Sequence, residues 1–193
     1  MQLRMLFDVK NSPIPDIQLP EKFELRSLRE DEIGIWGSVL HPACGFSVKD
    51  AEYMKIYGPR LLPNGIKGVF ERATGRLLAS ASAQYCECGV QGGLGWVMAL
   101  PEMRGRKLGA AVSAAAMQTV ADNGFKTICL ATDDNRLPAL KMYLAFGWRP
   151  WLYFEDMPER WKNICKNLQI APGSLENYTL DELGSIIVRN DLA

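Results

Sequence analysis

The chain has 193 residues, of which 48% are apolar and 23% are charged, and its 22 basic residues balance its 22 acidic residues. This length suits one sizeable core, and a net charge of zero argues against partners such as nucleic acid or an anionic membrane. Any site for an anion must therefore be local. No apolar run is long enough to span a membrane, and residues 1–11 lack the length and cleavage site of an export signal.

The cysteines and histidine also limit the function. Five cysteines, an odd number, show no CxxC pairing, and His41 is the only histidine. We therefore expect no metal site. Reduced cysteines in a cytoplasmic protein are the simpler interpretation.

The first 60 residues predict two strands and two helices. Alternating apolar residues at positions 3, 5, 7 and 9 predict a strand at a sheet edge. Proline-rich residues 11–20 predict an extended connector, and residues 23–28 a second strand. A helix is expected over about 31–40, with acidic residues in its first turn. Another is expected over 46–58, with Ser47 as its N-cap.

The middle of the chain predicts a strand meander followed by alternating helices and strands. Residues 65–71 and 76–86 flank the turn RATG and predict a hairpin, and residues 93–100 predict a third strand. The elements expected after it are a helix over about 108–123 closed by Gly124, a buried strand over 126–132, a helix over about 135–146 ended by Gly147, and a strand over 148–156.

Two capping-box patterns predict further helices near the C-terminus. Asp156 and Glu159 bracket Pro158 in the first, and Thr179 and Glu182 form the second. We therefore expect an α/β fold of the α+β type, with a central mixed, largely antiparallel sheet and helices on both faces. Residues 1–156 would form the domain, with a strand and extended lead-in over 1–20. Residues 157–193 would form a helical extension packed on it.

The stretch LPEMRGRKLGAAV, residues 100–112, joins a strand to an alanine-rich helix through a charged loop. Unpaired N–H groups and a partial positive charge at a helix N-terminus can hold phosphate. Gly105 and Gly109 would allow close approach of the backbone, and Arg104, Arg106 and Lys107 would add electrostatic attraction. A solvated basic turn before a packing helix is the alternative. The spacing fits neither a Walker loop nor a dinucleotide fingerprint.

The same stretch resembles the acetyl-CoA-binding motif of the GNAT superfamily of N-acyltransferases, Arg/Gln-x-x-Gly-x-Gly/Ala after a strand. Arg104 fills the first position and Gly109 the last, whereas Lys107 departs at the middle one. Residues 132–150 resemble the next motif of the family, through Asn135, Tyr143, Gly147, Trp148 and Pro150. The resemblance covers about residues 20–156. It also implies that Lys107 is tolerable if its backbone is helical rather than at positive φ.

The resemblance implies a role for each matching residue. The pantetheine arm of acetyl-CoA would bond main-chain groups of Val97, Met98, Ala99 and Leu100, and an N–H near Met98 would polarise the thioester carbonyl. The diphosphate would lie against Arg104, Gly105, Arg106, Lys107, Leu108 and Gly109. Asn135 would contact the pantetheine arm or cap its helix. Tyr143 would be the general acid for the leaving thiolate, because a phenol with a pKa of about 10 suits a thiol near about 8.5.

The implied reaction is direct transfer of an acetyl group to a primary amine of a small-molecule or peptide acceptor, without a metal. The general base stays unassigned, with Asp133 and Glu87 as candidates and His41 as a weaker site candidate. Residues 41–50 and 148–156 would recognise the acceptor. A non-catalytic acyl-CoA-binding or partner-binding module on the same fold, and another nucleotide-binding function, are the alternatives. A homodimer is compatible with the sequence, and the acyl length and the acceptor are left open.

Overall fold

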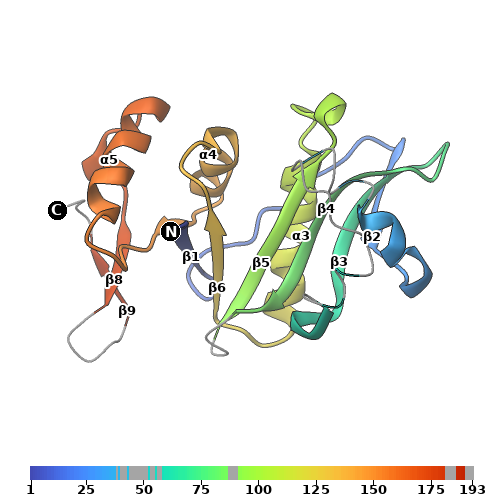
Figure 1. Ribbon diagram of the computed structural model, residues 1–193, viewed down its shortest axis with the longest axis horizontal. Helices are drawn as coiled ribbons and strands as arrows, with labels where there is room; N and C mark the ends of the chain where they lie inside the picture. Colours follow the sequence, from blue (N-terminus) through green and yellow to red (C-terminus); the bar gives the residue numbers. More distant parts are fainter. Residues whose placement is uncertain are drawn as a thin grey trace. The chain divides into compact units, whose positions relative to one another are not determined.

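The computed structural model describes residues 1–37, 39, 43, 52, 55, 58–86, 91–180 and 186–189 (Figure 1). The chain forms two compact units. We call residues 13–128 the central unit, and residues 1–12 together with 129–193 the terminal unit.

The central unit contains an antiparallel run of four strands. Neighbouring strands in order are β2 (Phe23–Ser27), β3 (Leu61–Glu71), β4 (Leu77–Tyr85) and β5 (Gly92–Ala99). The predicted hairpin is confirmed: a turn closed by bonds from the N–H groups of Thr74 and Gly75 to the carbonyl of Glu71 joins β3 to β4. Gly75 has a φ of +69°, which glycine adopts without steric cost.

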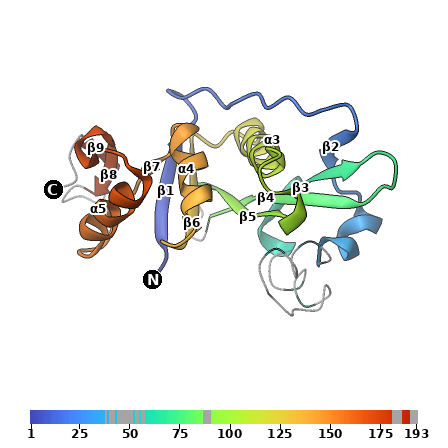
Figure 2. The ribbon, with the colours of Figure 1, turned by 90° about the horizontal axis from the view of Figure 1, so that it is seen from above.

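One face of these strands is covered by α3 (Leu108–Asp122), as Figure 2 shows. The helix approaches β5 so closely that a Cβ on Gly92 would lie 2.0 Å from Cγ1 of Val120. The alanines of α3 permit this approach, and much of the helix is buried. The predicted helix is confirmed, and it ends as expected before Gly124, whose φ is +86°.

The other side of the same strands carries η1 (Glu30–Ile35), a 3₁₀ helix (Figure 2). The predicted helix therefore begins at Glu30, and its first turns are tighter than expected. The predicted helix over 46–58 lies almost entirely outside the described residues. A short 3₁₀ turn, η2 (Gly58–Arg60), precedes β3.

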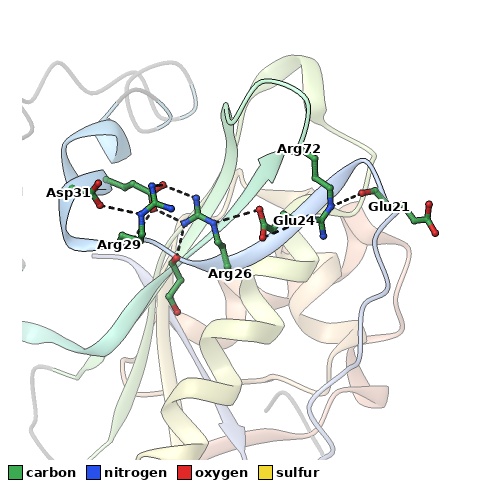
Figure 3. A network of polar contacts seen from close by, with 8 residues as sticks. Glu21, Glu24, Arg26, Arg29, Asp31 and Arg72 are labelled. Atoms are coloured by element: carbon green, nitrogen blue, oxygen red, sulfur yellow. Dashed lines mark hydrogen bonds and ion pairs between the residues drawn. The ribbon is translucent and has the colours of Figure 1, made fainter.

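A polar network around Arg26 fixes the step from β2 into η1 (Figure 3). The guanidinium of Arg26 donates from its two terminal nitrogens to the Glu32 carboxylate, at 2.6 and 2.7 Å. The same carboxylate accepts from the backbone N–H of Arg29 at 2.9 Å, which satisfies a helix-start donor. The hydrogen bond from Arg26 is the main cause that lowers the pKa of Glu32 to about 2 from its ordinary 4.5.

We expect this network to make stability depend on pH in the acid range. Because the folded-state pKa of Glu32 is depressed, its stabilisation is present above about pH 4.5 and is lost as the pH falls towards about 2. Glu32→Gln should lower the free energy of unfolding at pH 7 by about 1–3 kcal/mol and flatten its decline in acid. Urea unfolding at several pH values measures both, with exposed Glu30→Gln as the control. Equal acid sensitivity in wild type and Glu32→Gln would contradict the prediction.

In the terminal unit, β1 (Leu3–Asp8) lies between β6 (Thr127–Thr132) and β7 (Arg149–Pro150). The prediction of an edge strand is therefore wrong. The strand is interior because Leu6 interrupts the alternation and makes both faces of β1 apolar. Met5, Leu6 and Phe7 are all 0% exposed. β1 and β7 are antiparallel, with Met5 opposite Pro150. The strand predicted over 148–156 shrinks to the two residues of β7, and β6 begins within the central unit.

Two predicted helices of the terminal unit are confirmed, α4 (Leu137–Ala145) and α5 (Met157–Leu168). α5 buries Trp161, Ile164 and Cys165 on one face, as its periodicity predicts. Asp156 is its N-cap residue but makes no capping bond with its side chain. Arg160 of α5 donates instead to Asp134, after β6, and this hydrogen bond lowers the pKa of the Asp134 carboxyl.

The prediction of a second C-terminal helix from Thr179 is wrong. Residues there form the antiparallel hairpin β8 (Asn177–Leu180) and β9 (Ile186–Arg189). The β-branched residues Thr179 and 186–188 favour extended backbone over a helix. The capping-box pattern does not outweigh this preference. The described part of the extension contains α5, the short 3₁₀ turn η4 (Pro172–Ser174) and this hairpin, while the domain boundary at 156 stays a prediction. The predicted fold class, a mixed and largely antiparallel sheet with helices, is confirmed.

Candidate functional site

The charged loop between β5 and α3 has two residues in the left-handed region. After the turn η3 (Pro101–Met103), Gly105 has a φ of +78° and Lys107 a φ of +61°. Lys107 is the N-cap residue of α3 and makes no capping bond with its side chain. The condition under which lysine was expected to be tolerable here, a helical backbone, is therefore not met. The helix entrance needs a left-handed residue, which is why glycine suits this position and lysine is strained there.

The start of α3 presents backbone donors to open space. The N–H groups of Leu108, Gly109 and Ala110 belong to the first turn, where a helix supplies no acceptor. Leu108 is buried and anchors the helix start in the core. An ideal Cβ on Gly109 would meet no atom within 4 Å. This geometry fits a diphosphate group held by main-chain donors, since no described residue lies within 4 Å of a Cβ placed on Gly109.

Three cations lie beside these donors. Arg104, Arg106 and Lys107 are exposed, and no ion pair joins any of them to another described residue. The neighbouring carboxylate of Glu102 is instead paired with Arg76 at 2.7 Å. Although the whole chain is neutral, the loop is thus locally positive and suited to an anion.

The strand before the loop contains a β-bulge. Ser82 is opposite Gly95, but Ser80 is opposite Met98, so β5 has one extra residue. Trp96 absorbs it with a φ of +50° and packs edge-on against Trp36, with ring centroids 6.5 Å apart. The sequence carries no signal for this bulge, because tryptophan rarely adopts positive φ.

The pairing of β5 with β4 decides in which direction the main-chain groups of the four candidate residues, 97–100, point. The Leu100 N–H donates to the Leu78 carbonyl of β4 at 2.9 Å. Main-chain groups alternate in direction along a strand, so those of Met98 also point towards β4. Those of Val97 and Ala99 point away from it. The N–H groups of Val97 and Ala99, unlike that of Met98, therefore point to the side of β5 away from β4, which is the β6 side in the sheet order.

The candidate acid Tyr143 belongs to α4, in the terminal unit. Its side chain is 5% exposed, and its ring packs against Trp148 with centroids 5.9 Å apart. Burial is the main cause that raises the pKa of its phenol above the ordinary value of 10. The pKa of Tyr143 is therefore further above that of a thiol than the sequence predicts. The group stays protonated and is a hydrogen-bond donor at all working pH values.

Asn135 and Asp133 follow β6 in the terminal unit. Asn135 is exposed, and the N-cap residue of α4 is Arg136, so its capping alternative is wrong. Asp133 accepts from the side-chain amide of Gln2 at 3.0 Å and pairs with Arg136 at 3.2 Å. These bonds give Asp133 a structural role at the strand end and argue against it as a base.

Other candidates for acceptor recognition and base catalysis are divided between core and undescribed residues. His41 and Glu87 lie outside the described residues. Trp148 is buried, whereas Trp151 and Tyr153 stack with Arg4, whose guanidinium carbon lies 5.6 and 5.0 Å from their ring centres. These aromatic residues stabilise the terminal unit.

A model of the acetyltransferase (GNAT) family matches residues 25–148, well over half of the chain. The chain belongs to this family. No match was found among curated proteins.

Solved structures of GNAT proteins share the fold. A GCN5-related N-acetyltransferase from Sphaerobacter thermophilus has a TM-score of 0.67 at 16% identity, over 77% of this chain and 48% of that one. A putative GNAT acetyltransferase from Novosphingobium aromaticivorans has a TM-score of 0.57 at 21% identity, over 77% of this chain and 59% of that one. The ribosomal-protein-S18-alanine N-acetyltransferase of Escherichia coli has a TM-score of 0.54 at 18% identity, over 65% of this chain and 76% of that one. The chain spans about half the length of the first of these.

No helix among the described residues is both long and apolar enough to cross a membrane. Within the same residues, no group of three or more His, Cys, Asp or Glu side chains could hold a metal ion.

Proposed function

We propose that the protein is an N-acyltransferase that transfers an acetyl group from acetyl-CoA to a primary amine. The observation that carries the proposal is the entrance to α3. Unpaired main-chain donors, the open space at Gly109 and three exposed cations lie together there, in a chain of the GNAT family. These features match a diphosphate, and the family uses them for acetyl-CoA.

The proposed roles follow the directions of the groups. Main-chain groups of Val97 and Ala99 bond the pantetheine arm and polarise the thioester carbonyl, which gains negative charge as the amine attacks. Tyr143 donates a hydrogen bond to the sulfur as the C–S bond breaks. Its raised pKa makes it a weak acid, so the bond stabilises the developing thiolate before a proton moves. Asn135 contacts the pantetheine arm.

The acceptor is proposed to be a small molecule or a peptide with a free amine. One GNAT structure of the same fold is named for acetylating an alanine of a ribosomal protein. We further propose a cytoplasmic enzyme without nucleic-acid or membrane partners, for which a homodimer is one possible assembly. A non-catalytic acyl-CoA-binding module remains the second candidate, because β5 carries no carboxylate that could deprotonate the amine.

Calorimetric titration with acetyl-CoA tests the cofactor assignment. We expect micromolar binding that weakens with added salt, because exposed cations contribute to it. ADP should compete only weakly, since it lacks the pantetheine arm that β5 would hold. If acetyl-CoA fails to bind, the proposal is wrong. If ADP displaces acetyl-CoA at equal concentration, a different nucleotide-binding function is favoured.

A further inference from the structure

A row of polar side chains lies on the face of β4 opposite to α3. Gly92 of β5 faces α3, because a Cβ there would meet Val120. Side chains alternate along a strand, so Gly93 and Gly95 face the other way. Their partners on β4 are Gln84 and Ser82, which therefore share that face. This face, bearing η1 rather than α3, is distinct from the one that the helix covers (Figure 2).

Gln84 is held flat across the neighbouring strand. An ideal Cβ on Gly95 would lie 2.9 Å from Cδ, Nε2 and Oε1 of Gln84, and one on Gly93 would lie 3.0 Å from its Cγ. The two glycines thus form the floor on which the side chain rests. Ser82, 0% exposed, donates from its hydroxyl to Oε1 at 3.4 Å. The amide is therefore oriented by its surroundings rather than free to rotate.

The amide nitrogen is positioned to donate next to the bulge. Gly95, beneath the amide, is followed directly by Trp96 and then by Val97, whose main-chain groups point away from β4. Among the described residues, no hydrogen-bond acceptor is in place for Nε2 of Gln84. Gln84 is half-buried and its Nε2 is not among the buried atoms that lack a partner, so the amide is open to solvent and its donors are free for a ligand.

We propose that Gln84 selects the acceptor by donating a hydrogen bond from Nε2 to an oxygen near the reacting amine. This proposal rests on the proposed function and adds the class of acceptor. The preferred acceptors are primary amines with a carbonyl or hydroxyl oxygen two or three bonds from the nitrogen, such as a peptide N-terminus or an amino sugar. Simple alkylamines and the isolated amines of polyamines are poor acceptors.

Matched pairs of amines test the proposal, with CoA release as the readout. The pairs are alaninamide with isopropylamine, glucosamine with cyclohexylamine, and a tripeptide with hexylamine. Wild type should favour the oxygen-bearing member of a pair. Gln84→Met keeps the length and packing of the side chain but removes the donor, and it should reduce kcat/KM for that member about 3- to 10-fold. The alkyl member should be unaffected.

Gly95→Ala provides an independent variant. Its Cβ would meet the Gln84 amide first, because the three nearest atoms, all at 2.9 Å, belong to that side chain. Gly95→Ala should lower the preference for the oxygen-bearing amine of each pair. Gly34→Ala, where a Cβ meets no described atom within 4 Å, should leave that preference unchanged. Calorimetry with acetyl-CoA and thermal unfolding establish that each variant binds cofactor and is folded.

The outcomes separate this proposal from the function on which it rests. Loss of acetyl-CoA binding by wild type would overturn the proposed function itself. If wild type binds acetyl-CoA and acetylates the panel, but Gln84→Met and Gly95→Ala leave the preference unchanged, the role of Gln84 is overturned. Intact cofactor binding with no amine of the panel acetylated would also overturn it.

Discussion

Gly109→Val should abolish measurable acetyl-CoA binding without unfolding the protein. The valine side chain would begin in space where no described residue lies within 4 Å of its Cβ, so stability should change by less than about 1 kcal/mol. That space is where the diphosphate would approach the first-turn N–H groups of α3. We expect a loss of affinity of at least about 100-fold, or about 2.7 kcal/mol. Calorimetry and thermal unfolding measure the two effects separately.

Two matched variants accompany Gly109→Val. Gly109→Ala adds one methyl group, which the family pattern accepts at this position, and should bind acetyl-CoA nearly as well as wild type. Lys107→Gly relieves a left-handed residue with a φ of +61° and keeps its N–H, so it should preserve binding. Its stability should stay within about 1 kcal/mol, because the relief is offset by a more flexible unfolded chain. Equal losses from Lys107→Gly and Gly109→Val would show that the diphosphate is misplaced.

Tyr143→Phe should reduce kcat about 100-fold while leaving acetyl-CoA affinity within about twofold. The ring that packs against Trp148 is kept, so the fold should be unaffected. Because burial raises the pKa of the phenol above its ordinary value, its ionisation should produce no falling limb in the rate up to about pH 10. CoA release under saturating acetyl-CoA measures kcat, and calorimetry measures affinity.

A second tyrosine gives the control for this hydroxyl deletion. Tyr85 is 45% exposed and packs against Phe125 in the central unit, so Tyr85→Phe should leave both kcat and affinity unchanged. If Tyr143→Phe retains full turnover, the acid or hydrogen-bond donor for the thiolate is another group. If wild type binds acetyl-CoA but acetylates no amine, a non-catalytic module is favoured.

The main strands and helices, and the loop motif, could be predicted from the sequence alone. Periodicity and glycine placement located the β3–β4 hairpin, β5, α3, β6 and α4, because each depends on local backbone preference and on one buried face. The order of residues in 100–112 indicated an anion site for the same reason. A helix start after a strand creates its donors locally, and Arg104 and Gly109 mark it in the sequence.

Tertiary structure decided which groups are available and how they point. The left-handed Lys107, the bulge at Trp96 and the raised pKa of Tyr143 depend on neighbours distant in sequence or on burial. The interior position of β1 and the hairpin at residues 177–189 depend on strand pairing, which local periodicity does not encode. The Gln84 amide gains its orientation only because two glycines of β5 leave room for it. The sequence by itself thus determined the fold class and the position of the charged loop through local preferences, while long-range packing decided the direction and protonation of the groups around it.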